Sequence, residues 1–239
     1  MKGIFITFEG TEGSGKSTQI ITLFNRLRAL GHVVRSLREP GGTPIGEEIR
    51  HTLKHSEANY AMTSEAELLL MNASRAQLVR EIIRPALAAG EIILCDRFYD
   101  STTAYQGYGR ELDLKKVSEV IDFAVGETRP DLTLLLNVPI EVSEARRKTR
   151  QAMLLEVPQK EDRKQIAPLP FTEKLRDRME EADRSFFERV EKGYQAIAAA
   201  ESNRIKKIDA RQSKESIGEE IWKFVEPLVK GRILTLPPS

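Results

Sequence analysis

The feature that most constrains this chain is a glycine-rich segment near its start, placed between an apolar run and an amphipathic stretch. Residues 10–17 read Gly-Thr-Glu-Gly-Ser-Gly-Lys-Ser and fit the pattern G-x-x-x-x-G-K-[ST]. The glycines let successive backbone N–H groups turn toward one centre, where the N-terminus of the next helix adds positive potential. Lys16 can reach the outer phosphates of a nucleotide, and Ser17 is expected to hold Mg²⁺. A glycine-rich turn capped by Ser17 is the simpler alternative, but the flanking strand and helix patterns favour a phosphate-binding loop.

The rest of the chain alternates short apolar runs with longer amphipathic stretches, which is the pattern of repeated β-α units. The apolar runs predict strands over residues 3–8, 33–38, 91–95, 132–138 and 204–209. Apolar residues at three- and four-residue spacing predict helices over 16–30, 63–89, 112–125, 139–150, 175–200 and 214–230. We therefore expect an α/β fold, a three-layer sandwich in which helices flank a five-stranded parallel sheet.

The length of 239 residues suits one domain, and no internal repeat divides the chain. Residues 151–172 keep neither the helical nor the strand period, and they contain three prolines and a charged run. Such a segment is typical of a long mobile loop. The sequence thus predicts a single domain over 1–239, with a mobile lid and insert at about 146–178.

The overall charge excludes some classes of partner. With 37 Lys and Arg against 36 Asp and Glu, the net charge of +1 gives no reason to expect binding to nucleic acid or to an anionic membrane surface. No segment approaches the roughly 18 uninterrupted apolar residues of a membrane span. Cys95 is the only cysteine, so an internal disulfide is impossible and a reducing, cytoplasmic location is expected.

A phosphate-binding loop alone leaves GTPase switches, motor ATPases, transporters and small-molecule kinases open. A GTPase would carry Asn-Lys-x-Asp and Asp-x-x-Gly, and neither string occurs in the chain. The segment 96–110, which follows the third predicted strand, is dense in polar and aromatic residues, at the edge where an open parallel sheet keeps its binding crevice. There Asp96 could orient Mg²⁺ or its waters, and the planar fork of Arg97 suits a phosphoryl oxygen, although a surface ion pair between them is the alternative.

Two further segments are ambiguous on local chemistry. The segment 38–50 runs from a proline-glycine turn into a helix that carries Arg50, and it could be an ordinary turn. Arg75 lies midway along the apolar helix 63–89, where its cation could either reach the surface or bind a ligand. Neither segment decides between these readings without further information.

Taken together, five segments closely resemble the bacterial thymidylate kinase family in sequence, order and spacing. They are Phe8 to Thr18, Arg38 to Thr43, Ser74 to Gln77, Asp96 to Phe98 and Ala104 to Arg110. The likeness runs from residue 3 to about 150, resumes over 177–190, and ends with 208–210 and the last helix. Only the insert 151–172 stands outside it.

The resemblance implies a P-loop nucleoside-monophosphate-kinase fold, a homodimer, and transfer of the γ-phosphoryl group from MgATP to dTMP, giving dTDP and ADP. The family's ATP-binding residues would be Gly10, Thr11, Glu12, Gly13, Ser14, Gly15, Lys16, Ser17, Thr18, Arg146 and Arg211. Its dTMP-binding residues would be Glu39, Pro40, Arg50, Met71, Arg75, Arg97, Thr102, Tyr105 and Gln106. Its metal site would use Ser17 and Asp96, and its catalytic residues would be Glu12, Lys16, Arg97 and Arg150. In this assignment Arg75 meets the thymine carbonyl, Thr102 and Gln106 complete the base edge, and Tyr105 lies where a 2′-hydroxyl would go.

This chain departs from the family pattern at two places. Met71 stands where a phenylalanine often stacks on thymine, and Met71 has no ring face. Ser14 stands where some members carry an arginine, so a cation from the lid is expected to take that role, Arg150 first and Arg146 or Arg147 next. Because of Met71, kinases for another pyrimidine nucleotide or for a deoxynucleoside stay open. From another class of protein, a nucleotide-sensing protein that has kept the fold without turnover is a second alternative.

Overall fold

The computed structural model describes residues 2–146, 149 and 182–231, and its centre is a five-stranded sheet. The strands are β1 (Ile4–Glu9), β2 (Val34–Arg38), β3 (Ile92–Asp96), β4 (Leu132–Asn137) and β5 (Ile205–Asp209). They are ordered β2-β3-β1-β4-β5, and every neighbouring pair is parallel. Because all five carboxyl ends share one edge, the loops after β1, β2 and β3 meet there.

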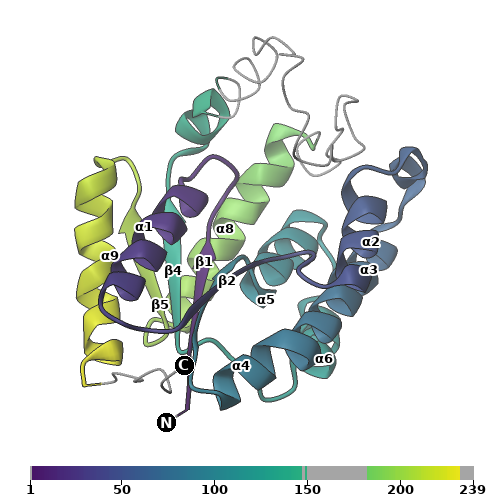
Figure 1. The fold of residues 1–239 in the computed structure, drawn as a ribbon. Helices are drawn as coiled ribbons and strands as arrows, with labels where there is room; N and C mark the ends of the chain where they lie inside the picture. The colour runs from purple at the N-terminus through teal and green to yellow at the C-terminus, as the bar shows by residue number, and fades with distance from the viewer. Residues whose placement is uncertain (1, 147–148, 150–181, 232–239) are drawn as a thin grey trace, which may run out of the picture.

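Helices cover both faces of the sheet (Figure 1). They are α1 (Lys16–Ala29), α2 (Pro44–Lys54), α3 (Ser64–Leu78), α4 (Arg84–Ala88), α5 (Tyr99–Thr102), α6 (Leu114–Val125), α8 (Arg184–Ala200) and α9 (Lys214–Val229). A π-helical turn, Val79–Ile83, joins α3 to α4, and another, Thr103–Gly109, continues α5. Figure 1 shows α1 and α9 together on one side of the sheet, and α2, α3, α4 and α6 on the other.

Successive side chains of a strand point to opposite faces of the sheet, so the same strands contribute to two apolar clusters, one on each face. Ile4, Ile6 and Phe8 of β1 pack with the apolar stripes of α1 and α9. Phe5, between them on the opposite face, packs with residues of α3 and α6. A third cluster joins α8 to Tyr105. Since both faces are covered, the inner strands β1, β3 and β4 read as nearly continuous apolar runs, whereas the edge strands β2 and β5 carry charged residues.

The predicted α/β sandwich with a five-stranded parallel sheet is confirmed. The predicted helix 63–89 is continuous from 64 to 88, although its middle is π-helical. The segment 96–110 was predicted only as a polar crevice segment, and it is helical from 99 to 109. The predicted helix 175–200 begins at Arg184 within the described residues, after Asp183 caps it by accepting the Phe186 N–H.

Two predictions concern residues outside the described ranges. The insert 151–172 and most of the lid at 146–178 lie outside the described residues, as does Arg150. Of the predicted helix 139–150, residues 140–146 are helical. None of the helices in the described ranges is long and apolar enough to cross a membrane.

Candidate active site

The glycine-rich loop connects the buried end of β1 to the first turn of α1. Gly10, Gly13 and Gly15 have φ angles of 130°, 80° and 96°, in the left-handed region that only glycine adopts without strain. The Lys16 ammonium donates to the carbonyls of Gly10 and Thr11, both at 3.1 Å, so its side chain folds over the loop. Burial, and then the nearby Arg97 cation, lower the pKa of Lys16 to about 8. The protein surroundings therefore disfavour the positive charge of Lys16, and an anion bound in the loop would stabilise it.

Ser17 and Asp96 lie together beside this loop. The Ser17 hydroxyl donates to Asp96 Oδ2 at 3.3 Å, while Asp96 Oδ1 is buried without a partner among the described residues. No group of three or more His, Cys, Asp or Glu side chains in the described residues could hold a metal by itself. A hydroxyl and one carboxylate fit Mg²⁺, which takes few protein ligands and completes its shell with phosphate oxygens and waters.

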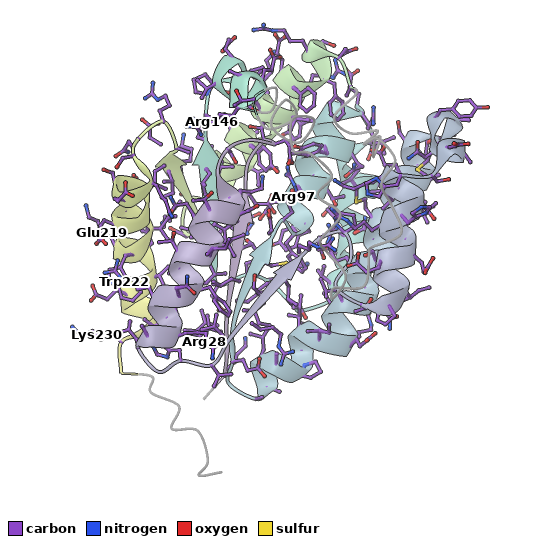
Figure 2. All side chains as sticks on the ribbon, turned by 45° about the horizontal axis from the view of Figure 1, so that its top comes forward. Arg28, Arg97, Arg146, Glu219, Trp222 and Lys230 are labelled. Atoms are coloured by element: carbon purple, nitrogen blue, oxygen red, sulfur yellow. The ribbon has the colours of Figure 1, made fainter. Side chains whose placement is uncertain are left out.

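Arg97 follows β3 with a φ of 70°, one of two non-glycine residues with positive φ in the described part of the chain. Its Nη1 donates to the Gly10 carbonyl at 3.0 Å, and its Nη2 donates to Glu12 at 3.3 Å and to the Tyr105 hydroxyl at 3.2 Å. Arg97 thus spans the space between the glycine-rich loop and the helical segment 99–109. Figure 2 shows it in the middle of the molecule.

Glu9 is a buried acid that the sequence did not single out. It ends β1 at 0% exposure, and its carboxylate accepts from the Phe98 N–H at 2.7 Å, the Ser101 hydroxyl at 2.6 Å and the Tyr194 hydroxyl at 2.9 Å. Burial, and then the charge of Asp100, raise the pKa of Glu9 to about 7. The same two hydroxyls accept hydrogen bonds from Arg97, so Glu9 fixes the surroundings of that arginine.

A second group surrounds Arg75 on α3, which is 2% exposed. Its guanidinium donates to Glu39 from Nε at 2.8 Å and contacts the same carboxylate oxygen from Nη2 at 2.7 Å. Nη1 donates to Asn72 at 2.8 Å and to Thr102 at 2.9 Å. Burial raises the pKa of Glu39, partly offset by Arg75, and Glu39 Oε1 has no partner among the described residues. Arg75 is therefore a buried, paired cation and not a surface one, which resolves the ambiguity in the sequence.

The two groups border one cavity. It is lined by Glu12, Glu39, Pro40, Lys54, Met71, Arg75, Arg97, Ser101, Thr102, Tyr105, Gln106 and Phe187. A second hollow beside it is lined by Glu12, Gly13, Gly15, Lys16, Ser17, Thr18, Arg38, Glu39, Arg50, Lys54, Asp96, Arg97 and Arg146. Glu12, Glu39, Lys54 and Arg97 belong to both, so they stand where the hollows meet. Four residues of these walls were not among the predicted site residues, namely Arg38, Lys54, Ser101 and Phe187.

Of the remaining predicted residues, Arg50 and Arg146 line the second hollow and Arg211 does not. Arg50 donates to the Pro40 carbonyl at 2.8 Å, and Arg146 reaches the carbonyls of Gly13 and Ala210 at 3.5 and 3.1 Å. Arg146 is labelled nearer the upper edge of the molecule in Figure 2. Arg211 is exposed and pairs with Asp209, and it lines neither hollow.

Comparisons with known proteins agree with the geometry. A sequence model described as thymidylate kinase matches residues 8–221. Thymidylate kinase of Alcanivorax borkumensis is 42% identical over 228 residues, which cover 95% of this chain and 98% of that protein. Thymidylate kinase of Synechococcus sp. (strain JA-2-3B'a(2-13)) is 43% identical over 224 residues, covering 94% and 95%. The crystal structure of thymidylate kinase from Ehrlichia chaffeensis superposes with a TM-score of 0.69 at 28% identity, covering 94% of this chain and all of that one. The chain belongs to the thymidylate kinase family.

Proposed function

We propose that this protein transfers the γ-phosphoryl group of ATP to dTMP, giving dTDP and ADP for dTTP biosynthesis. One observation carries the proposal: a hollow at the glycine-rich loop and a cavity around Arg75 meet at Arg97 and Glu12. Direct phosphoryl transfer needs two nucleotides with their phosphates end to end. The donor nucleotide would fill the first site and the acceptor the second.

At the donor site the glycine-rich loop and Lys16 would bind the ATP phosphates. Ser17 and Asp96 would hold Mg²⁺, which neutralises charge on the phosphates when bound. Arg97 would bind the acceptor phosphate and stay in contact with the transferred group as negative charge spreads over its oxygens. Glu12, paired with Arg97 at 3.3 Å, would limit where the guanidinium can point.

At the acceptor site Arg75 would donate to a base carbonyl, and Thr102 and Gln106 would line the base edge. Glu39, Pro40 and Arg50 would surround the acceptor phosphate side of the cavity. Tyr105 would lie under the sugar, where its ring favours deoxyribose. Met71 offers flexible apolar contact to the base.

We also propose that the whole chain is one kinase domain with a lid at about 146–178. Arg150 is our first choice for the lid cation, and Arg146, which lies near the loop at Gly13, is the next. Arg211 would border the adenine. Lid closure would exclude the water that otherwise competes for the phosphoryl group.

A homodimer is the assembly that we propose. Phe123 on α6 is 85% exposed and Leu69 on α3 is 58% exposed, and these two helices pack against each other. Burying such apolar side chains against each other is favourable because it removes their surface from water, so they suit contact with a second copy of the chain. We further place the protein in the cytoplasm, since its one thiol, Cys95, is free and buried and its substrates are nucleotides.

The test is ADP release with MgATP against dTMP, dUMP, UMP, CMP, dCMP, dGMP, AMP and thymidine. We expect dTMP to be preferred, and Arg97→Ala to lower kcat about 100-fold or more, because it removes a donor to the transferred group. Arg129→Ala is the control, since Arg129 pairs with Asp122 on the surface. A preference for thymidine or another monophosphate would refute the acceptor assignment, and no turnover with any acceptor would indicate a nucleotide-sensing protein.

A further inference from the structure

The Gln106 side chain is buried at 1% exposure, and the nitrogen of its amide already makes a hydrogen bond within the protein. Its Nε2 donates to Glu67 Oε1 at 2.8 Å. Glu67, on α3, is fully buried, and both of its carboxylate oxygens accept from Arg110, at 3.1 Å each. Arg110 in turn lies over the Phe186 ring, 4.6 Å from its centre.

This pairing determines which way the Gln106 amide faces. A carboxylate that faces a guanidinium on both oxygens accepts hydrogen bonds, so only the NH₂ end of the amide can be turned toward Glu67. Turning the amide over would bring its oxygen against a carboxylate oxygen in a buried site, at the cost of a lost hydrogen bond and direct repulsion. The amide oxygen is therefore the acceptor that Gln106 keeps for the cavity that it lines, beside the second N–H of Nε2.

The cavity wall then has a fixed polar pattern. Arg75 carries only donors, of which the longest is the bond from Nη2 to the Phe98 carbonyl at 3.3 Å, so this N–H is the one that a base carbonyl could take over, and Gln106 offers an acceptor. A 4-oxo pyrimidine such as thymine or uracil presents the complementary pair, a carbonyl oxygen at C4 and an N–H at N3. Cytosine presents an amino group and an unprotonated N3, so each of its groups would meet a like group on the wall.

We infer that Glu67 and Arg110 are positioning residues that set the choice between 4-oxo and 4-amino pyrimidines by locking the Gln106 amide. This rests on the proposed function, since it assumes that the pyrimidine base enters this cavity. Neither residue touches the substrate. They act through Gln106, and the exposed part of Arg110 does not line the cavity.

The experiment compares dTMP with 5-methyl-dCMP, which keeps the ring methyl group and differs only at the edge that Gln106 would face. Wild type is expected to favour dTMP by about 100-fold or more in kcat/KM, because buried polar groups are left unpaired with the wrong base. Glu67→Gln can present either a donor or an acceptor to Gln106, so the dTMP to 5-methyl-dCMP ratio should fall by about tenfold or more. The change should appear mainly in KM and in the equilibrium affinity of each monophosphate measured by calorimetry.

Two variants separate positioning from folding. Arg204→Gln breaks a comparable buried pair with Asp100, away from Gln106, and should lower Tm while keeping the ratio. Glu67→Asp retains the charge facing Arg110 but withdraws it from Gln106, so the ratio should fall in this variant even if Glu67→Gln fails to fold. Wild type that does not use dTMP would overturn the proposed function and this inference with it. Wild type that uses dTMP and 5-methyl-dCMP equally, or a folded Glu67 variant with an unchanged ratio, would overturn the inference alone.

Discussion

Glu9→Gln tests whether the acid at the end of β1 carries a proton near neutral pH. Glutamine has nearly the same shape and can still accept from the Phe98 N–H, while its NH₂ can donate to the Ser101 or Tyr194 hydroxyl after those rotate. The substitution therefore removes the ionisation and keeps most of the contacts. Its effect on stability should depend on pH in a defined direction.

The magnitude follows from the two pKa values. Burial raises the pKa of Glu9 in the folded protein to about 7, from its ordinary 4.5. The folded state thus holds the proton more tightly than the unfolded state, so the stability that this provides is complete below pH 4.5 and is lost as the pH rises through 7. Between pH 5 and 8 the free energy of unfolding of wild type should fall by about 2 to 3 kcal/mol relative to Glu9→Gln.

The assay is urea unfolding of both proteins without nucleotide, followed by tryptophan fluorescence and circular dichroism at pH 5, 6, 7 and 8. Other titrating groups act on both proteins and cancel in the difference. The free energy of unfolding of Glu9→Gln should rise relative to that of wild type as the pH increases over this range. A difference that stays constant to within about 0.5 kcal/mol would show that Glu9 is ionised throughout, and the argument from burial would be wrong.

Three shorter predictions concern other parts of the structure. Since burial lowers the pKa of Lys16 to about 8, ATP affinity should fall about tenfold between pH 7 and 9 as the charge is lost; calorimetry on Lys16→Met should show no such fall. Arg75→Ala leaves the buried Glu39 carboxylate unpaired and should cost about 3 to 5 kcal/mol of stability in urea unfolding, whereas a loss below about 1 kcal/mol would contradict the pairing. In the homodimer that we propose, Phe123→Lys should leave a monomer by light scattering without lowering Tm, and an unchanged mass would remove α6 from the proposed interface.

Most of the fold could be predicted because each element has its own local signal. The apolar runs at β1 and β3 and the helical period of α9 needed no knowledge of the rest of the chain. The strand order could not be predicted in this way, since it depends on which distant strands pair. The helical state of 99–109 was missed because its polar and aromatic residues mask the 3.6-residue period, and packing against α8 and α6 decides it.

The site residues also divide into those with a local sequence signal and those that depend on contacts distant in the sequence. The spacing of glycines, lysine and serine over residues 10–17 was enough to predict the phosphate-binding loop. The roles of Thr102, Tyr105 and Gln106 came from family resemblance. Glu9 could have been noticed as a carboxylate at the end of a strand that is otherwise apolar. Tyr194 had no such signal, because it lies 185 residues from the Glu9 carboxylate that it contacts. Glu67 looked like one more polar residue of an amphipathic helix, and only the structure shows that it is fully buried.

The central place of β1 in the sheet has a consequence for how the protein is made. The phosphate-binding loop leaves the ribosome before β3, β4 and α8, but β1, which leads into this loop, pairs with β3 and β4, and Glu9 contacts Tyr194. At about 5 to 20 residues per second, the 185 residues from Glu9 to Tyr194 take roughly 10 to 40 s to synthesise. The nascent chain therefore carries its most recognisable motif for many seconds before the neighbours that shape it exist. The loop should accordingly bind nucleotide only late in folding, after β3, β4 and α8 have packed around β1.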